Sequence, residues 1–383
     1  MKKSLLKHPK HSASSCAWTP GTRSTASRLS CEAELLRSSV ARRNPASGFT
    51  LIELMISLVL GLIIVAAAIQ LFIAGVTSYK LQKAMSHIQD NASLGLNFIV
   101  NDIRKANLSA PVPAVNDKIE YAGILVSTNN IGEKINLNCL ACFDEPNKDK
   151  EDDSKPLKSF EKSNLTGAAE NDQLLIRYQA PQAGFDCSGN KLEKDDFVVQ
   201  RYYVNKSTKD EPRRSLRCQA AQYTQADLDG KSDTNKLSLS WGGGQIILPN
   251  VDYFTVRYGW MDGGLNDASS TIEYGDLTKY SGQTVDKNID GIIQKVRPHI
   301  HAIQLGVLVQ SADTAGNQSI VKERNGRPFQ VLGSDVELDE KYKNGHLRQA
   351  VNQTISLRNA MGWVTEGCEF GASSPKCTGE SGT

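Results

Sequence analysis

The sequence predicts an α+β fold, in which one long N-terminal α-helix packs on a mostly antiparallel β-sheet domain with long loops. Two changes in hydrophobic patterning lead to this prediction. Residues 49–76 form an almost unbroken apolar run, and apolar positions then recur every three or four residues as far as residue 103. This is the period of an α-helix. From residue 119 the period changes to two, which is typical of β-strands.

The composition fits a folded protein that carries one membrane-spanning helix. The chain has 383 residues, 39% of them hydrophobic, and a formal net charge of +2. A net charge so close to zero provides no electrostatic attraction for nucleic acid, so we expect no nucleic-acid partner. The length allows more than one domain. We expect three segments, which comprise residues 1–48, 49–107 and 108–383.

Residues 49–76 are long enough to cross a membrane as a helix, because roughly 20 apolar residues suffice. Glu53 and Gln70 are the two strongly polar residues in this run. A carboxylate is costly in lipid, so Glu53 is a candidate functional residue. Arg42 and Arg43 precede the run. Basic residues hold their end of a span in the cytoplasm, so we expect the chain after the span to lie outside the cytoplasm.

The helical pattern continues beyond the apolar run on one face only. The apolar positions of this face are Leu81, Met85, Ile88, Ala92, Leu96, Ile99 and Ile103. The opposite face is polar and carries Lys80, Lys83, Gln89, Asp90, Asn97, Asn101 and Lys105. We therefore expect one helix over residues 49–107 that ends before Pro111. Its second half is expected to pack on a domain through the apolar face.

The pattern in the remainder of the chain predicts strands separated by polar stretches. The expected strands are Ile119–Val126, Gln173–Gln179, Phe197–Val204, Val251–Trp260, His301–Gln310 and Leu347–Leu357. They are rich in β-branched and aromatic residues and are bounded by turn residues. The polar stretches comprise residues 144–172, 205–236 and 262–290, and we expect them to be long surface loops.

The head of the apolar run has the sequence Gly48-Phe49-Thr50-Leu51-Ile52-Glu53-Leu54. It resembles the processing motif of type IV prepilins and type II secretion pseudopilins. The resemblance implies that a prepilin peptidase cuts between Gly48 and Phe49 and methylates the new amine of Phe49. Residues 1–48 would then be a cytoplasmic leader, and residues 49–76 would span the membrane and later enter the core of a fibre. An ordinary membrane anchor with a chance glutamate is the alternative.

The same resemblance gives Glu53 a role. In this family the matching glutamate is proposed to pair with the terminal amine of a neighbouring subunit, here that of Phe49. The pairing is chemically sensible, because a carboxylate and an amine in an apolar bundle each need a partner of opposite charge.

Three further segments resemble the PilW family of minor pilins, namely residues 102–106, 300–311 and 347–359, the last of which ends Leu-Arg-Asn. The resemblance implies a minor type IV pilin that helps to initiate pilus assembly at or near the tip, with roles in adhesion and twitching motility. It also implies a single-pass inner-membrane protein with a periplasmic domain, which later joins the fibre at the cell surface. The implied partners are the prepilin peptidase, the major pilin, other minor pilins, the inner-membrane assembly platform and a tip adhesin.

Two alternatives to this function stay open at this point. One is a minor pseudopilin of a type II secretion or DNA-uptake system. The other is a membrane-tethered binding domain, in which the helix acts only as an anchor.

Six cysteines follow the apolar run. An even set of cysteines outside the cytoplasm predicts disulfide bonds. We expect nearest neighbours to pair, which gives Cys139 with Cys142, Cys187 with Cys218, and Cys368 with Cys377. The first pair could also form half of a zinc site or a redox centre. A zinc ribbon needs a second such pair, and a redox centre needs a βαβ context, so a structural disulfide is favoured.

The sequence predicts no enzyme and no cofactor. The His-Glu-x-x-His, Gly-x-Ser-x-Gly and Gly-x-x-x-x-Gly-Lys motifs are all missing from the chain. Asp286, Asn288 and Asp290, followed by Gly291, match the first half of a calcium loop. The twelfth position of that loop is Arg297 instead of glutamate, which argues against an EF-hand. A looser calcium site therefore remains an alternative to a polar turn.

His299 and His301 lie two residues apart, and therefore on one face of an expected strand. No third metal ligand lies nearby in the sequence. We expect the two histidines to lie on an exposed strand edge.

Overall fold

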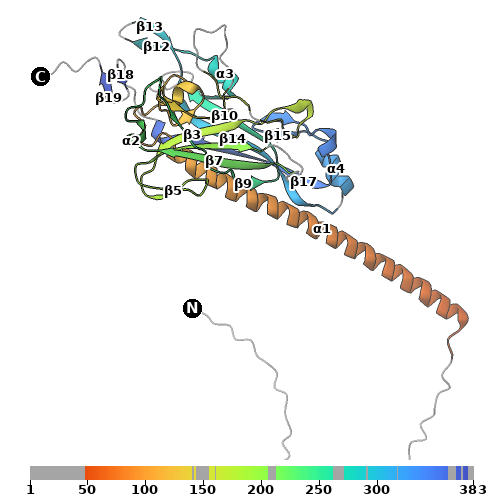
Figure 1. The fold of residues 1–383 in the computed structure, drawn as a ribbon. Coiled ribbons are helices and arrows are strands. Elements are labelled where there is room, and N and C mark those ends of the chain that lie inside the picture. The colour runs from red at the N-terminus through yellow and green to blue at the C-terminus, as the bar shows by residue number, and fades with distance from the viewer. Residues whose placement is uncertain are drawn as a thin grey trace, which may run out of the picture. The chain divides into compact units, whose positions relative to one another are not determined.

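The computed structural model (Figure 1) describes residues 48–139, 142–143, 155–159, 161–205, 213–261, 271–289, 292–316, 318–360, 368–371 and 374–377. The chain divides into two compact units, residues 1–65 and 66–383. The first unit contributes the start of the long helix α1, which spans Leu51–Lys105. The second unit contains the remainder of α1 and the sheets. The predicted α+β fold with a long N-terminal helix is confirmed.

Two antiparallel sheets form the centre of the second unit. The five-stranded sheet has the order β1-β3-β6-β7-β9, and the four-stranded sheet has the order β11-β10-β14-β17. The strands of the first are β1 (Ile124–Leu125), β3 (Gln173–Gln179), β6 (Phe197–Val204), β7 (Ser215–Tyr223) and β9 (Gln245–Pro249). The strands of the second are β10 (Val251–Met261), β11 (Ile272–Gly275), β14 (Ile300–Thr314) and β17 (His346–Ser356).

Smaller elements surround these sheets. The two-stranded pairs are β2 (Ile135–Asn136) with β8 (Leu237–Ser238), β4 (Gly184–Phe185) with β5 (Lys191–Leu192), β12 (Val285–Ile289) with β13 (Ile292–Val296), β15 (Phe329–Val331) with β16 (Ser334–Val336), and β18 (Cys368–Gly371) with β19 (Ser374–Cys377). The short helices are α2 (Gln225–Leu228), α3 (Leu277–Ser281) and α4 (Gln318–Asn325). Single 3-10 turns occur at Thr128–Ile131, Thr166–Ala168, Glu340–Tyr342 and Arg358–Ala360.

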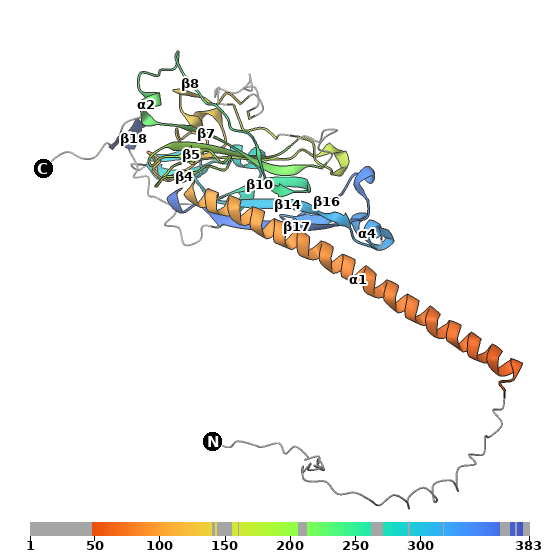
Figure 2. The ribbon, with the colours of Figure 1, turned by 60° about the horizontal axis from the view of Figure 1, so that its bottom comes forward.

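The C-terminal part of α1 shares one hydrophobic core with both sheets. The two ribbon views show this part of the helix running along the sheets (Figures 1 and 2). Its buried residues are Ala84, Ile88, Ala92, Gly95, Leu96, Ile99, Val100, Asp102 and Ile103. The apolar face predicted from the sequence is therefore the packed face from Ile88 onward, whereas Leu81 and Met85 remain exposed. Gly95 allows the closest approach, because a Cβ there would lie 2.8 Å from the carbonyl oxygen of Ile247 in β9.

The five-stranded sheet is covered on both faces. Alternate side chains of β3, such as Leu174 and Ile176, pack into the core that contains α1. The intervening Leu175 packs into a second core, which Ile131 and Leu157 also help to form. A sheet buried on both faces reads as a continuous apolar run. This explains why the strand prediction for residues 173–179 rests on composition more than on polar alternation.

The segment before β3 joins the two sheets. The backbone N–H of Asp172 donates to the carbonyl of Phe254 in β10 at 2.9 Å, and the Phe254 N–H donates to Oδ1 of Asn171 at 2.9 Å. The Asp172 carboxylate then accepts the Val256 N–H at 2.9 Å. These bonds satisfy backbone groups along part of the β10 edge that would otherwise be open.

Several sequence predictions differ from the structure. The strand expected over residues 119–126 is reduced to Ile124–Leu125, because Tyr121 adopts a positive φ of 55° that no strand allows. The stretch 205–236, expected to be a loop, contains β7, an interior strand of the five-stranded sheet. The histidine prediction is also wrong, since His301 is buried in β14, which lies between β10 and β17.

Candidate functional site

The head of α1 is formed by the sequence of residues 48–54. Helix α1 begins at Leu51, and the Thr50 hydroxyl accepts the backbone N–H of Glu53 at 3.2 Å. Thr50 therefore acts as the N-cap, which satisfies one of the free donors at a helix start. Phe49 precedes the cap and its side chain is 81% exposed. Glu53 lies within the first turn, where a negative charge is favoured by the helix dipole.

The apolar side chains near the head of α1 are exposed. An 18-residue window of this helix has a mean hydropathy of 2.8, and none of that window is buried. Large apolar residues from Leu51 to Phe72 are at least half exposed. Within the described part of the chain, the Glu53 carboxylate has no hydrogen bond or ion pair of its own. A helix of this kind needs lipid or other helices around it.

The other end of α1 is closed by two asparagines. Asn107 has a φ of 64°, the left-handed conformation that ends many helices. Its amide donates to the carbonyl of Asn359 at 2.8 Å. In return, the Asn359 amide donates to the carbonyls of Arg104 and Ala106, both at 3.1 Å. The Leu-Arg-Asn sequence therefore ends in a residue that caps the C-terminus of α1.

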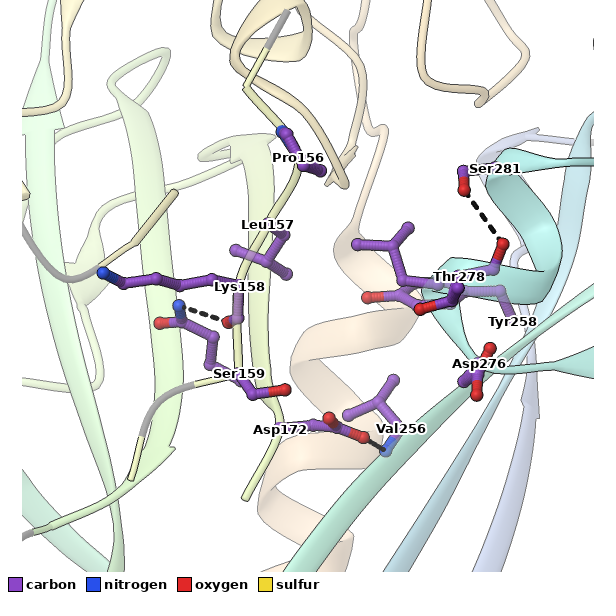
Figure 3. A pocket seen from close by; sticks show the side chains of 12 residues that line it. Pro156, Leu157, Lys158, Ser159, Asp172, Val256, Tyr258, Asp276, Thr278 and Ser281 are labelled. Atoms are coloured by element: carbon purple, nitrogen blue, oxygen red, sulfur yellow. Dashed lines mark hydrogen bonds between the residues drawn. The ribbon is translucent and has the colours of Figure 1, made fainter. Parts of the chain in front are cut away.

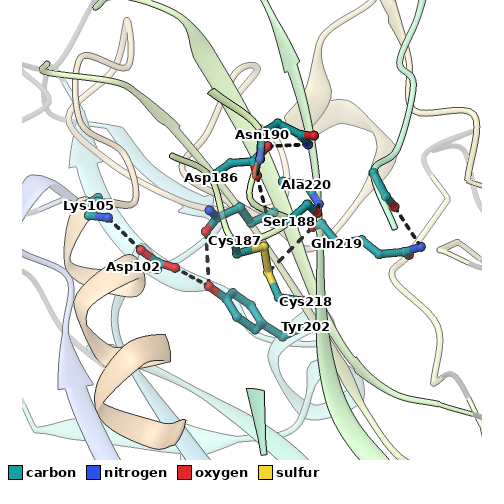
Figure 4. Close-up of a disulfide and its surroundings, with 12 residues drawn as sticks. Asp102, Lys105, Asp186, Cys187, Ser188, Asn190, Tyr202, Cys218, Gln219 and Ala220 are labelled. Carbon is teal, nitrogen blue, oxygen red and sulfur yellow. Dashed lines mark hydrogen bonds and ion pairs between the residues drawn. A yellow bond between two sulfur atoms is a disulfide. The ribbon is translucent and has the colours of Figure 1, made fainter. Parts of the chain in front are cut away.

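A buried carboxylate lies one turn before this cap (Figure 4). Asp102 is 4% exposed, and it accepts the Tyr202 hydroxyl at 2.6 Å and the Lys105 ammonium at 2.7 Å. The Tyr202 hydroxyl is also 3.1 Å from the Gln200 amide. Burial and the Asp102 charge raise the pKa of Tyr202, so this hydroxyl stays protonated and donates. These contacts fix α1 against β6.

The disulfide between Cys187 and Cys218 lies beside this group and is confirmed (Figure 4). It ties β7 to the loop between β4 and β5. Cys139 and Cys142 also form a disulfide, within a short turn. Cys368 and Cys377 face each other in the register of β18 and β19. Their side chains lie outside the described residues, so this pairing remains a prediction.

The calcium candidate falls in the hairpin of β12 and β13. Asp286 and Asn288 lie in β12, opposite Lys295 and Ile293, so this segment is a strand and not a calcium loop. Asp290 lies outside the described residues. Among the residues that the structure describes, no group of three or more His, Cys, Asp or Glu side chains could hold a metal ion. Calcium binding stays a prediction.

A polar pocket of about 350 Å³ lies between the segment before β3 and α3 (Figure 3). Asp172 and Asp276 both line it. Burial raises the pKa of Asp172, whose carboxylate accepts the Val256 N–H and the Thr255 hydroxyl. Asp276 caps α3 by accepting the Lys279 N–H at 2.7 Å. Both carboxylates thus hold local structure, and we assign the pocket no catalytic role.

Two family models match the chain. A model described as the prokaryotic N-terminal methylation motif matches residues 43–69. A model described as type IV pilus-assembly protein W matches residues 201–359. A comparison with curated proteins gave no match. Among solved structures, a type IV-like pilin from Thermus thermophilus has 12% identity and a TM-score of 0.31, with 72% of this chain and 98% of that chain covered. Similarity at this level carries no functional argument.

The two family matches contain the residues that define the two ends of α1. The first contains Gly48, Phe49 and Glu53 at the exposed apolar head. The second ends at Asn359, which caps the helix at its packed end. The first match and the exposed apolar helix also indicate a membrane-anchored pilin. These two matches make the chain similar to the minor type IV pilins of the PilW family.

Proposed function

We propose that this minor pilin helps to initiate assembly of a type IV pilus at or near the fibre tip. The observation that carries the proposal is the exposed apolar surface of α1, with Glu53 as a carboxylate without a partner in the described chain. Such a surface suits a helix that moves from lipid into a bundle of similar helices. The two family matches favour a structural role, association with other pilins and the pilus machinery, and attachment to a membrane.

The first step of the proposal is processing. The chain is held in the inner membrane with residues 108–383 in the periplasm, because Arg42 and Arg43 keep the head of the span in the cytoplasm. A prepilin peptidase cuts between Gly48 and Phe49 and methylates the new amine. Residues 1–48 are lost, and Phe49 becomes the first residue of the mature chain.

The second step is charge pairing during assembly. Glu53 lies one helical turn from Phe49, so the two groups are close to the same end of α1. A carboxylate in lipid is costly without a cation. The terminal amine of Phe49 on a neighbouring subunit provides that cation. The pair would set the axial position of one helix against the next.

The partners in this proposal are the major pilin, other minor pilins, the inner-membrane assembly platform and a tip adhesin. The match to pilus-assembly protein W favours a pilus over a type II secretion or DNA-uptake pseudopilin. A large domain closed by disulfides also suits a subunit present in few copies.

The test is the substitution Glu53→Val in the full-length protein, with Gln70→Val as the matched control. Both changes remove a strongly polar side chain from the apolar run. We expect Glu53→Val to leave cleavage intact and to reduce both incorporation into sheared fibres and the number of pili. Gln70→Val should assemble as wild type does. Normal piliation in the Glu53→Val strain would contradict the pairing of Glu53 with the Phe49 amine and the assembly role inferred from it.

A further inference from the structure

Helix α4 and the turn before it are seated directly on α1. All of these residues belong to the second compact unit. Gly316 has a φ of +74°, and a Cβ there would lie 3.3 Å from the Lys80 Cβ and 3.6 Å from the Thr77 Cα. Val321 of α4 and Ala315 are buried with Ala84 of α1 in one small hydrophobic cluster. The position of α4 along α1 is therefore fixed by close packing.

An apolar groove of about 560 Å³ lies between these two helices. On the α1 side it is lined by Ile73, Ala74, Thr77 and Leu81 among others, and on the α4 side by Ile320. Ile320 is 63% exposed, although Val321 next to it is buried. A short, otherwise polar helix therefore presents one large apolar side chain towards the part of α1 that carries exposed apolar residues.

This groove lies at the level where the surface of α1 changes character. The apolar run ends at Val76, and the following turn carries Tyr79, which is 65% exposed, and Lys80. Tyrosine is enriched where a membrane-spanning helix leaves the hydrocarbon and enters the headgroup region. Ile320 therefore lies at the level of α1 where such a helix would leave the hydrocarbon.

Basic residues are close neighbours in sequence of the residues that line the groove, and we call them the basic rim. They are Lys80 and Lys83 on α1, and Lys322, Arg324 and Arg327 on α4 and just after it, all of them exposed. Lys80 lies beside Gly316, whereas the Arg324 guanidinium lies over the ring of Phe329 at 4.3 Å. Two acidic residues are also nearby. Glu323 is paired with Arg327 at 2.7 Å, and Asp313 lies at the end of β14. The excess of cations suits a surface that carries phosphates.

We propose that α4 and the adjoining turns of α1 form a membrane-resting surface on the periplasmic side. Ile320 enters the boundary between headgroups and acyl chains, and the basic rim contacts the phosphates of anionic phospholipids. This inference rests on the proposed function, because it requires α1 to span the membrane. The groove is continuous with the lipid-facing apolar surface of α1, and the rim has the complementary charge, so lipid is a better occupant than another subunit.

The consequence is a second membrane contact for the domain. Contact of α4 with the bilayer would limit rotation of the domain about the helix axis of α1 while the subunit is in the membrane. Extraction into a fibre would have to break this contact, and the freed groove would then be open to a neighbouring helix.

The experiment places the photoreactive residue p-benzoylphenylalanine in the full-length protein, reconstituted in nanodiscs that contain phosphatidylglycerol. Three single variants replace Ile320, Phe72 or Ile293. Phe72 lies on the exposed apolar part of α1 and reports insertion, and Ile293 is 71% exposed on β13 and serves as the matched control. Irradiation is followed by intact-mass measurement of phospholipid adducts.

We expect adducts at Phe72 and Ile320 and none at Ile293. In nanodiscs made only of phosphatidylcholine, the yield at Ile320 should fall while that at Phe72 is unchanged. Lys322→Gln in the Ile320 variant should reduce the yield of phospholipid adducts at position 320 by up to about fivefold. This is the contribution of one basic residue near an anionic surface. Lys194→Gln, a distant exposed lysine, should have no effect.

Each remaining outcome overturns the inference in a distinguishable way. Adducts at Phe72 without adducts at Ile320 would leave the membrane span in place and remove the role of α4. The absence of adducts at Phe72 would show that α1 is not inserted, which would remove the proposed membrane topology as well. Crosslinks from Ile320 to protein instead of lipid in native membranes would assign the groove to another subunit.

Discussion

Glu53 and Asp102 are carboxylates on the same helix in opposite surroundings. Asp102 is buried, and it is bonded to the Tyr202 hydroxyl and the Lys105 ammonium. Glu53 is exposed, and in the described chain its carboxylate has no such partner. Removing the partner of a buried carboxylate is costly because the charge stays desolvated. The first carboxylate therefore stabilises the domain, whereas the second, in the proposed function, takes its partner from a neighbouring subunit.

His301 is a buried base in the middle strand of the four-stranded sheet. It is 4% exposed, and its Nδ1 atom has no hydrogen-bond partner among the described residues. Burial lowers the pKa of His301, because the charged imidazolium loses its hydration. The folded state then favours the neutral ring, whereas the unfolded chain takes up a proton at the ordinary pKa of histidine.

This difference predicts a pH dependence of stability. The contribution of His301 is present above the unfolded pKa of about 6.5, and it is lost as the pH falls from there through the lowered pKa of the folded state. We expect His301→Gln to flatten the fall in the free energy of unfolding across that range, measured by urea titration in detergent with tryptophan fluorescence. His87→Gln, at an exposed position of α1, is the matched control for loss of an imidazole. A slope equal to that of wild type in His301→Gln would contradict the assignment.

At the scale of single elements, the C-terminus of α1 depends on a residue from the far end of the domain. Asn359 donates to the carbonyls of Arg104 and Ala106, two of the groups that a helix end leaves free. Asn359→Ala removes both donors and leaves these carbonyls to water. We expect it to destabilise the domain by about 1–3 kcal/mol, the usual effect of losing two such bonds.

The measurement is urea unfolding, together with hydrogen exchange of the last turn of α1, which should become faster. Arg358→Ala changes the exposed neighbour in the same 3-10 turn and is the control. Unchanged exchange in Asn359→Ala would mean that packing alone holds the end of the helix.

The long helix and the strands rich in β-branched and aromatic residues could be predicted from the sequence, because their patterns are local. Residues 173–179 and 197–204 form β3 and β6 with the predicted bounds. Strand β7 was not predicted, because Arg217, Gln219 and Gln222 interrupt its apolar positions. Its alternate residues Leu216, Cys218 and Ala220 pack against the core beside α1.

The candidate site divides in the same way. Gly48, Phe49 and Glu53 lie within six residues of each other, so their arrangement is visible in the sequence. Asp102 with Tyr202 and Asn107 with Asn359 are separated by 100 and 252 residues. Their contacts depend on the packing of α1 against the sheets, which no local pattern specifies. The resemblance around residues 102–106 and the Leu-Arg-Asn ending were the signals that could have indicated them.

For the whole molecule, the proposed processing at Gly48 would decide whether the chain can leave the membrane as a pilin. A Cβ at Gly48 would meet no atom within 4 Å, so a substitution there leaves the fold undisturbed. We expect Gly48→Ala, or a bulkier residue, to block cleavage. The protein purified from its native membrane should then keep its leader, whereas wild type should begin at N-methylated Phe49.

Intact-mass measurement of the N-terminus distinguishes these states. Gly61→Ala is the control, since a Cβ at Gly61 also meets no atom within 4 Å but lies away from the cleavage point. It should be processed normally. If the Gly48→Ala protein had the same mature mass as wild type, the proposed cleavage position would be refuted.

The pairing of Asn107 with Asn359 also imposes an order on biosynthesis. A ribosome makes Asn107 first and needs 252 more residues before its partner exists. During that time the end of α1 has no cap, and β14 has no β17 beside it. Contacts between such distant residues form slowly, because a long loop must close first. A chain terminated just before Asn359 would keep its apolar helix yet lack the residue that closes the domain on it, so the uncapped end of α1 would distinguish unfinished subunits from complete ones.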